Sequence, residues 1–389
     1  MTKKLVILGS TGSIGVQVLD IVRRYPSHFS IEALVAGRNL DLLVKQAKEF
    51  KPKQVMIHDE NLYASLKQEL DGMIDEVGAG MDAILQVAGQ KVDLVVGAIT
   101  GASGIAPCHA ALMTGNHLAL ANKEAMVCAG ELLNKIASQK GVHILPMDSE
   151  HNALFQLIEG RDMNEVQSMT LTASGGPFRN FSLNKMKHAS KAEALRHPNW
   201  SMGDKITIDS ATMMNKGLEL IEAYHLFHLP PEHLHIVVHP QSIVHGLVEW
   251  KDGAQMLSFG APDMAAPIAH CLNWPQRLDK AVMPVDLAAL GKLEFESLDE
   301  TRFIAPKLAM DALKAGTAAC IRLNAANEIA VDAFLNEQIT FLQIMELCQT
   351  CLEQPNHHDG NLNDDVDAIL DYDQQSRQYA LKRLQQWVA

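Results

Sequence analysis

The chain has 389 residues, of which 47% are apolar and 20% are charged, and its formal net charge is −13. At about 100–200 residues per domain, this length predicts two or three domains with substantial apolar cores. The negative charge disfavours general binding to nucleic acid, which is itself a polyanion. It does not exclude a local basic site for a single phosphate group.

The sequence predicts neither an export signal nor a membrane span. The N-terminal apolar run "LVIL" is shorter than the roughly 7–15 residues of a signal peptide. Residues 94–122 lack Asp, Glu, Lys and Arg, but their glycines and proline favour two buried parallel strands joined by a short helix. The six scattered cysteines are expected to be reduced thiols of a cytoplasmic protein. The lone Cys348 and Cys351 pair is expected to pack rather than bind zinc.

The first part of the chain alternates predicted strands and helices, which indicates a parallel sheet wrapped by helices. Strands are expected at 4–8, 30–37, 54–58, 93–99, 117–122 and 142–147, and helices at 13–25 and 40–50. From about residue 166 the pattern is mixed, with strands at 166–178, 235–250 and 254–260 and a helix at 212–227. Residues 306–352 and 368–388 have helical patterns.

The expected fold is therefore α/β, with an N-terminal Rossmann-like parallel sheet domain, a central α+β catalytic domain and a C-terminal helical domain. The expected boundaries are 1–148 for the nucleotide-binding domain, 149–273 for the central domain, 274–300 for a linker and 301–389 for the helical domain. The linker is inferred from its prolines and its few periodic apolar residues.

A glycine loop follows the first predicted strand. In "LVILGSTGSIG", Gly9, Gly12 and Gly15 have the spacing GxxGxxG and lead into a helix. Such a loop allows a tight turn and brings backbone amides close to a pyrophosphate. The alternative is a strand-to-helix turn that binds nothing, and the position of the loop at the start of an alternating region favours a dinucleotide.

The end of the second strand indicates which dinucleotide. Chains that bind NAD usually carry an acidic residue about 20 residues after the loop, which holds the ribose hydroxyls. Here the strand ends in Gly37, Arg38 and Asn39. A guanidinium group suits a 2′-phosphate, so NADPH is favoured over NADH. The alternative is that Arg38 is only a solvated surface residue.

Two carboxylates follow the predicted strand at 142–147, in "PMDSEHNA". On an extended segment the side chains of Asp148 and Glu150 would point the same way. Two close carboxylates repel each other unless a cation lies between them, and oxygen ligands suit Mg²⁺ or Mn²⁺. The equally favoured alternative is a helix start, with Asp148 or Ser149 as the N-cap.

The segment "DSATMMNKGLELIEAYHLF" adds further polar groups. Asn215, Glu219 and Glu222 fall on one face of the predicted helix, and the hydroxyl, amide and ammonium groups of "DSAT" and "NK" near its start would hold a phosphate monoester. Ser174 lies at a glycine-rich strand end. The segment 196–205, "RHPNWSMGDK", is expected to be a mobile lid that closes an aromatic side chain over a ligand. The alternatives are a solvated polar stripe and an ordinary surface loop around Trp200.

Together these segments resemble the 1-deoxy-D-xylulose 5-phosphate reductoisomerase family. The resemblance covers nearly the whole chain and rests on "GSTGSIG", "LANKEAMV", "PMDSEHNA", "ASGGPF", "RHPNWSMG", "DSATMMNKGLE" and "HPQSIVH", in family order. It implies an NADPH-dependent and divalent-metal-dependent reductoisomerase of isoprenoid biosynthesis that converts 1-deoxy-D-xylulose 5-phosphate to 2-C-methyl-D-erythritol 4-phosphate. The skeleton would rearrange by retro-aldol cleavage and re-addition or by a direct α-ketol shift. The cation would be Mg²⁺, Mn²⁺ or Co²⁺, and the protein a cytoplasmic homodimer.

The resemblance also implies roles for particular residues. The metal ligands would be Asp148, Glu150 and Glu219, which together with Lys123 would form the catalytic centre. The substrate would contact Lys123, Ser149, Glu150, Ser174, His197, Ser210, Asn215, Lys216 and Glu219, with its phosphate on Ser174, Ser210, Asn215 and Lys216. NADPH would bind Thr11, Gly12, Ser13, Ile14, Gly37, Arg38, Asn39, Asn122, Glu124 and Gly203. The tail from about Gln354 is the least similar part.

Two other functions stay open. Another NADPH-dependent dehydrogenase, of the semialdehyde or homoserine type, would also join a leading nucleotide domain to a mixed second domain. A semialdehyde enzyme needs a thiolate nucleophile, and Cys128, the cysteine nearest a candidate motif, lies in an apolar helix-like run. A non-catalytic nucleotide-binding regulator would not need clustered metal and phosphate groups.

Overall fold

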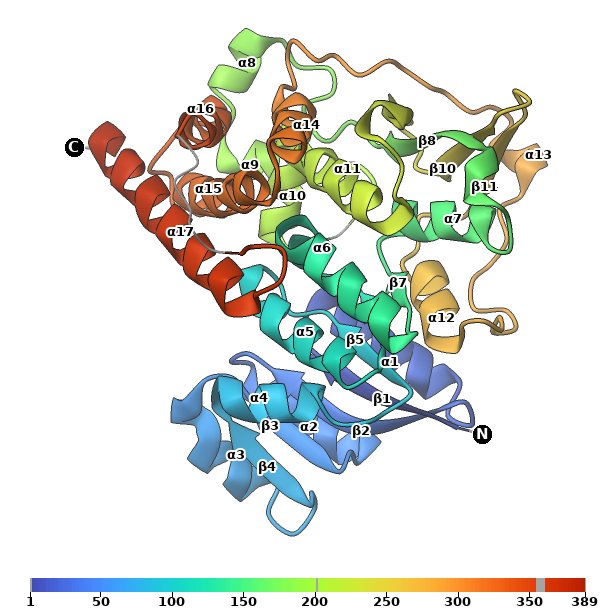
Figure 1. Ribbon diagram of the computed structural model, residues 1–389, viewed down its shortest axis with the longest axis vertical. Coiled ribbons are helices and arrows are strands. Elements are labelled where there is room, and N and C mark those ends of the chain that lie inside the picture. Colours follow the sequence, from blue (N-terminus) through green and yellow to red (C-terminus); the bar gives the residue numbers. More distant parts are fainter. Residues whose placement is uncertain (1, 201, 355–360, 389) are drawn as a thin grey trace. The chain divides into compact units, whose positions relative to one another are not determined.

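The computed structural model describes residues 2–200, 202–354 and 361–388 (Figure 1). Its contacts divide the chain into two compact units. The first comprises Met1–Ala125, Leu132–Asn152 and Asp263–Met283, and the second comprises Met126–Glu131, Ala153–Pro262 and Pro284–Ala389. The four-part division expected from the sequence stays a prediction.

The first unit is built on a parallel sheet with the strand order β4-β3-β2-β1-β5-β6-β7. The strands are β1 Lys3–Leu8, β2 Phe29–Ala36, β3 Gln54–Ile57, β4 Glu76–Ala79, β5 Leu94–Gly97, β6 His117–Leu120 and β7 Ile144–Pro146. The short β4, which carries a glutamate and a glycine, was not expected. The order reverses between β1 and β5, and dinucleotides bind at the carboxyl ends of strands at such a reversal.

Helices connect these strands and cover the sheet. They are α1 Ser13–Arg24, α2 Leu40–Phe50, α3 Tyr63–Glu69, α4 Gly80–Ala88, α5 Ile105–Met113, α6 Lys123–Lys140 and α12 Ala265–Asn273, with 3-10 turns η1 Glu60–Leu62 and η2 Ala102–Gly104. The uncharged segment 94–122 forms two buried strands joined by α5, as expected. Within the described residues, no helix is both long enough and apolar enough to cross a membrane.

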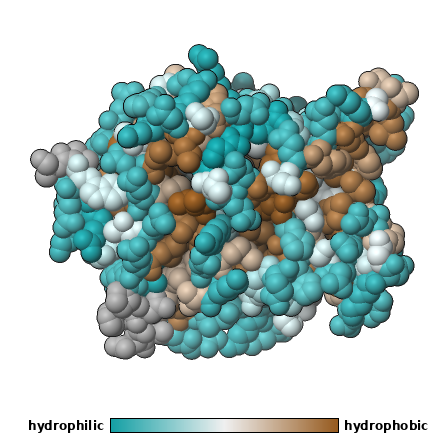
Figure 2. Space-filling model, turned by 90° about the horizontal axis from the view of Figure 1, so that it is seen from above, coloured by the Kyte–Doolittle hydropathy of each residue, from teal (hydrophilic) through white to brown (hydrophobic). Residues whose placement is uncertain are grey.

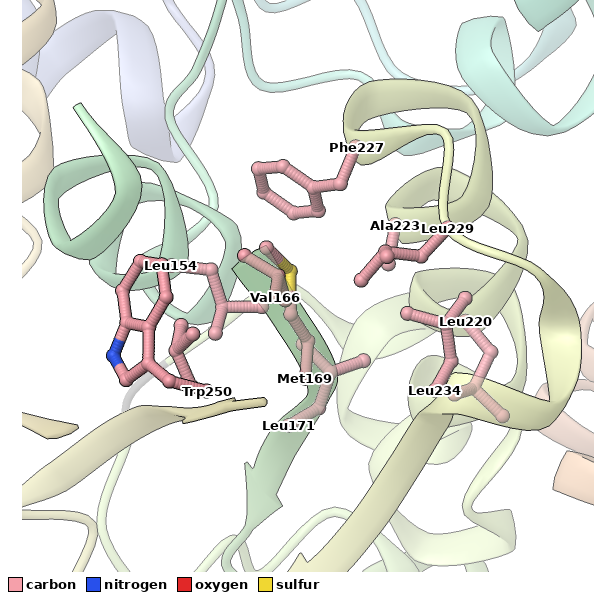
Figure 3. Packing of buried hydrophobic residues seen from close by; sticks show 11 residues of the cluster. Leu154, Val166, Met169, Leu171, Leu220, Ala223, Phe227, Leu229, Leu234 and Trp250 are labelled. Atoms are coloured by element: carbon pink, nitrogen blue, oxygen red, sulfur yellow. The ribbon is translucent and has the colours of Figure 1, made fainter. Parts of the chain in front are cut away.

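The second unit contains a sheet with the order β11-β10-β8-β9, in which only β8 and β9 pair in parallel. Its strands are β8 Val166–Ala173, β9 Leu234–Val238, β10 Val244–Trp250 and β11 Gln255–Phe259. Helices α7 Ser149–Ile158 and α11 Met214–Phe227 contribute Leu154 and Leu220 to a core with Met169 and Trp250 (Figure 3). Helix α7 therefore begins in the first unit and packs in the second.

The second unit contains further helices, and those after residue 301 agree with the helical pattern of the C-terminal sequence. They are α8 Leu183–Lys187, α9 Lys191–Ala194, α10 Asp204–Thr212, α13 Leu287–Leu290, α14 Ala305–Ala315, α15 Thr317–Leu335, α16 Phe341–Leu352 and α17 Val366–Val388, with η3 Met163–Glu165 and η4 Pro231–His233. Helix α15 packs against both α16 and α17 (Figure 1). Cys348 and Cys351 are buried in α16 as free thiols, as expected. The expected α/β fold class is confirmed.

Candidate active site

The glycine loop makes a turn that side chains could not enter. Gly9 has φ +89°, and a Cβ atom there would lie 2.5 Å from the carbonyl oxygen of Ala98. Gly15 is equally crowded, because a Cβ would meet the backbone of Gly9. Gly12 is the N-cap of α1 and has no side chain to cap the helix. The tight turn and the first backbone amides of α1 thus form a cradle of the kind that accepts a pyrophosphate.

The same loop is bonded to the end of the second strand. The amides of Gly9 and Ser10 donate to the carbonyl oxygen of Val35, at 2.9 and 2.8 Å. This places the residues Thr11–Ile14 beside Gly37–Asn39, as a dinucleotide site requires. Arg38 is exposed, while the side chain of Asn39 caps α2 by accepting from the amide of Leu42 at 3.2 Å.

A second turn, from β6 into α6, supplies the buried residues Asn122, Lys123 and Glu124. The Asn122 side chain accepts from the amide of Ala125 at 2.7 Å and donates to the carbonyl of Gly101 at 2.8 Å. Its amide group is therefore used within the protein, and any cofactor contact of Asn122 would use its backbone. The ammonium group of Lys123 lies 3.1 Å from Oδ2 of Asp148.

The segment around Asp148 is a helix start rather than an extended strand. Helix α7 begins at Ser149, so the expected alternation of side chains at positions 148 and 150 is wrong. Oδ1 of Asp148 accepts from the amide of Glu150 at 3.2 Å and lies 3.3 Å from Nδ1 of the buried His151. Because one carboxylate oxygen caps the helix and the other meets Lys123, Asp148 is held firmly in place. The N-cap alternative is correct and compatible with a ligand role.

Sequence reasoning missed the residues that fix this turn. Asn152 donates to the carbonyl of Pro146 at 2.9 Å, and its amide nitrogen lies 3.1 Å from Nδ1 of His270 on α12. Cys271 also donates to Pro146, at 3.1 Å. An asparagine four residues after an aspartate carries no periodic or motif signal, because its partner lies 118 positions away.

In the second unit, Ser174 and His197 meet. Nε2 of His197 lies 3.1 Å from Oγ of Ser174, and Nδ1 of His197 accepts from the amides of Asn199 and Trp200 at 3.2 and 2.9 Å. Because Nδ1 accepts, the proton of the neutral imidazole is on Nε2, which donates to the serine. The expected lid segment is thus attached to the glycine-rich end of β8. Ser201 of that segment lies outside the described residues.

Ser210 lies in the last turn of α10, not at a helix N-terminus as expected, because the chain breaks at Met213 with φ +64°. Helix α11 starts only at Met214. Gly176, with φ +65°, allows the glycine-rich loop to approach this turn, since a Cβ there would lie 2.5 Å from the carbonyl oxygen of Ser210. Gly176 therefore brings the loop that follows Ser174 against the backbone of Ser210.

The start of α11 gathers Asn215, Lys216 and Glu219. The ammonium group of Lys216 pairs with Oε2 of Glu219, and the amide of Asn215 donates to Oε1 of the same carboxylate. The Lys216 and Glu219 side chains are 6% and 1% exposed. The polar stripe of α11 is therefore largely buried rather than solvated: Glu219 and Glu222 are buried and Asn215 is partly buried. Buried charges at this density are typical of functional sites.

Asp148, Glu150 and Glu219 are a group of carboxylates that could hold a metal ion. One oxygen each of Asp148, Glu150 and Glu219 lies within 4.8 Å of the others. Close carboxylates raise one another's energy unless a proton or a cation intervenes. An all-oxygen set suits a hard divalent cation such as Mg²⁺ or Mn²⁺. The donor set therefore fits the cation expected from the sequence.

Comparisons with known proteins identify a family for this chain. The family model described as 1-deoxy-D-xylulose 5-phosphate reductoisomerase matches residues 5–130, and two models of the C-terminal domains of the same enzyme match residues 144–227 and 259–379. The reductoisomerase of Pelodictyon phaeoclathratiforme is 45% identical over 98% of this chain and 99% of its own length. That of Chlorobium phaeovibrioides is 48% identical over 97% and 98%.

Solved structures give the same result. A crystal structure of DOX-P reductoisomerase in complex with NADPH, fosmidomycin and magnesium has a TM-score of 0.94 and 43% identity, and covers 98% of each chain. The Zymomonas mobilis 1-deoxy-D-xylulose 5-phosphate reductoisomerase in complex with NADPH has a TM-score of 0.92 and 40% identity, and covers 99% of each chain. This chain belongs to the 1-deoxy-D-xylulose 5-phosphate reductoisomerase family.

Proposed function

We propose that this chain catalyses the NADPH-dependent isomerisation and reduction of 1-deoxy-D-xylulose 5-phosphate to 2-C-methyl-D-erythritol 4-phosphate, a step of isoprenoid biosynthesis by the non-mevalonate route. The observation that carries the proposal is the carboxylate cluster of Asp148, Glu150 and Glu219, flanked by two buried lysines. A dehydrogenase of the semialdehyde or homoserine type would not need this cluster. The near-complete coverage of reductoisomerase relatives also favours the reductoisomerase.

NADPH would bind at the glycine loop. The cradle of Thr11, Gly12, Ser13 and Ile14 supports a pyrophosphate, and the adjacent Gly37–Asn39 supports the adenosine ribose. We expect Asn122, Glu124 and Gly203 to line the nicotinamide end. Two solved relatives carry NADPH in their descriptions.

The exposed Arg38 would hold the 2′-phosphate. Arg38→Met should therefore raise the KM for NADPH and leave the KM for NADH nearly unchanged. A wild-type preference for NADH would contradict this assignment.

The cation would be held by Asp148, Glu150 and Glu219, and Mg²⁺, Mn²⁺ and Co²⁺ all suit these oxygen donors. When bound, it would act as a Lewis acid on the carbonyl and the neighbouring hydroxyl of the substrate. Lys123, fixed on Asp148, would place a positive charge or a proton beside the reacting oxygens. Ser149 would contact the substrate next to these ligands.

The phosphate of the substrate would be held in the second unit. Gly176 brings the loop that follows Ser174 against the backbone of Ser210, and Asn215 and Lys216 begin the next helix. His197, which carries its proton on Nε2, would act with Ser174 at the base of the lid. Closure of the segment 196–205 would exclude water from the reacting fragments.

The decisive experiment follows the absorbance of NADPH with 1-deoxy-D-xylulose 5-phosphate as substrate. We expect oxidation that stops on addition of EDTA and resumes with excess Mg²⁺. Turnover that is insensitive to the chelator would favour a metal-independent dehydrogenase. No oxidation of NADPH under any metal condition would favour a non-catalytic regulator.

We also propose a cytoplasmic homodimer. All six cysteines are free and buried, which suits a reducing compartment. The face shown in Figure 2 presents hydrophobic patches among polar side chains, and the large exposed apolar residues of the second unit include Phe259, Leu287 and Phe295. Exposed apolar surface of this kind favours subunit association. Sedimentation at micromolar concentration should give about twice the monomer mass of 42.7 kDa.

A further inference from the structure

A buried carboxylate in α10 has no part in the reaction proposed above. Asp209 is 1% exposed and lies one position before Ser210. Its Oδ2 lies 2.8 Å from the ammonium group of Lys205, and its Oδ1 accepts from the side-chain amide of Asn327 at 2.8 Å. A carboxylate withdrawn from water is unfavourable unless it is paired and hydrogen-bonded, and both oxygens of Asp209 are.

The contact with Asn327 limits the rotation of α10 about its own axis, and the contact with Lys205 holds the Asp209 carboxylate in place for it. Lys205 lies in the first turn and Asp209 in the next, so their pairing ties the beginning of the helix to its end. Asn327 belongs to α15 and lies 118 positions along the chain, so its bond anchors α10 from outside. Successive side chains on a helix are separated by about 100°. The direction of the Ser210 hydroxyl therefore follows from where the Asp209 carboxylate is held.

The other side of α10 is held by the glycine-rich loop. The carbonyl of Ser210 packs against Gly176, next to Ser174. Asn327 and Gly176 thus approach α10 at adjacent positions, one through the Asp209 side chain and one through the Ser210 backbone. The contact with Gly176 is limited only by the space between the atoms. The hydrogen bond from Asn327 to the Asp209 carboxylate also fixes the direction of the contact.

We propose that Asn327 and Lys205 are positioning residues which, through Asp209, orient Ser210 toward the phosphate group of the substrate. The inference rests on the proposed function only in taking Ser210 as a phosphate ligand. Stability alone does not account for the arrangement, because an apolar pair of similar size stabilises a protein as well as a buried charged pair does. The helix α15 of the C-terminal part therefore influences substrate affinity without touching the substrate.

Asn324 offers a matched control on the same helix. It is as fully buried as Asn327, and its amide donates to Glu328 within α15 at 3.0 Å rather than to α10. Asn324→Leu and Asn327→Leu make the same chemical change at the same depth. Only Asn327→Leu removes the bond to Asp209.

The experiment measures KM for the sugar phosphate and for NADPH, and the rise in Tm produced by inorganic phosphate, in the full-length enzyme. Asn327→Leu should raise the KM for the sugar phosphate about tenfold, reduce the phosphate-induced rise in Tm, and change the KM for NADPH less than twofold. Asn324→Leu should lower the basal Tm similarly and leave the KM for the sugar phosphate within about twofold of wild type. Equal phosphate effects in both variants, or none in Asn327→Leu, would overturn the inference.

Two further variants keep the test decisive. If Asn327→Leu does not fold, Lys205→Met removes the more exposed contact of Asp209. It should show the same selective rise in the KM for the sugar phosphate. An unchanged KM would count against the inference. Exchange of the two groups, by Asp209→Asn with Asn327→Asp, restores a donor and an acceptor across the same gap. It should recover part of the affinity lost in Asn327→Asp alone, and no recovery would mean that the hydrogen bond is not the cause.

Lys216→Ala separates this inference from the proposed function. It should weaken phosphate binding directly. If it leaves the phosphate effect unchanged, the phosphate site itself is wrongly assigned. If it weakens phosphate binding while Asn327→Leu and Lys205→Met do not, only the positioning role fails.

Discussion

At the residue scale, the site depends on close backbone approaches as much as on charged groups. Gly176 brings the end of β8 against the carbonyl of Ser210, so two hydroxyls from distant segments can share one phosphate. No other residue type combines φ +65° with a missing Cβ at low energy.

Gly176→Ala should therefore damage the phosphate site. The new methyl group would lie 2.5 Å from the Ser210 oxygen, so α10 or the loop must shift. We expect the KM for the sugar phosphate to rise about tenfold or more, because small displacements weaken charged hydrogen bonds. Gly141→Ala is the control: its φ is +65° and nothing lies within 4 Å, so it adds the same backbone strain without the clash. Similar KM values for the two variants would show that strain alone is responsible.

Glu219→Gln should weaken the cation site while the fold is kept, because the amide has nearly the same shape but no charge. We expect the concentration of Mg²⁺ for half-maximal activity to rise at least about tenfold, with kcat strongly reduced. Glu222→Gln is the matched control, since Glu222 lies on the same helix, is equally buried, and is outside the carboxylate cluster. Wild-type metal dependence in Glu219→Gln would remove this residue from the proposed site.

At the element scale, α11 combines the polar face that we propose for phosphate and metal with an apolar face, and most of both faces is buried. Sequence periodicity predicts a helix with an apolar face here, and its side chains Met214, Leu218 and Ile221 are buried. It could not show that the polar face is buried as well, because a stripe of Glu and Asn has the same pattern on an exposed helix. Nor could it locate the break at Met213, whose left-handed conformation follows from the packing of α10 and α11.

His225, in the last turn of α11, should make the free energy of unfolding depend on pH. Burial, with a smaller effect from His228, lowers the pKa of His225 to about 4. The unfolded state takes up the proton near pH 6.5, so stability should fall as pH decreases from about 6.5 to 4, by up to about 3 kcal/mol. Urea titrations across this range should show a smaller decrease for His225→Leu. The pKa of His117 is also lowered, chiefly by burial, so the variant should keep part of the slope. A wild-type slope in the variant would mean that His225 does not titrate on unfolding.

At the scale of the whole molecule, the fold class and the order of the motifs could be predicted from the sequence. Buried parallel strands such as β1 and β5 are continuous apolar runs, which leave a strong signal. The four-residue β4 does not. Contacts between distant positions, such as Asp209 with Asn327 and Asn152 with His270, also give no signal in the sequence. Neither segment carries a pattern that identifies its partner. The complete set of metal ligands is implied by the family resemblance, and of the two local geometries considered for Asp148 and Glu150 the helix start is correct and the extended segment is wrong.

The cysteines should be unreactive in the native protein. All six are buried, and burial raises the pKa of the Cys108 thiol to about 12 and that of Cys351 to about 11. Because the thiolate is the reactive species, Ellman's reagent should modify less than one thiol per chain quickly in buffer, and all six in guanidinium chloride. A rapid stoichiometric reaction at Cys128 that abolishes turnover would revive the thiol-dehydrogenase alternative.

The three clustered carboxylates and the two lysines paired with them have a consequence for the order in which ligands can be added. If all five are ionised, these side chains together carry one excess negative charge without a cation and one excess positive charge after a divalent ion binds. A doubly charged phosphate ester would be repelled in the first state and attracted in the second, through a medium that screens poorly. Metal-free enzyme should therefore bind inorganic phosphate more weakly than loaded enzyme, and rapid mixing should show a lag when the ion is supplied last.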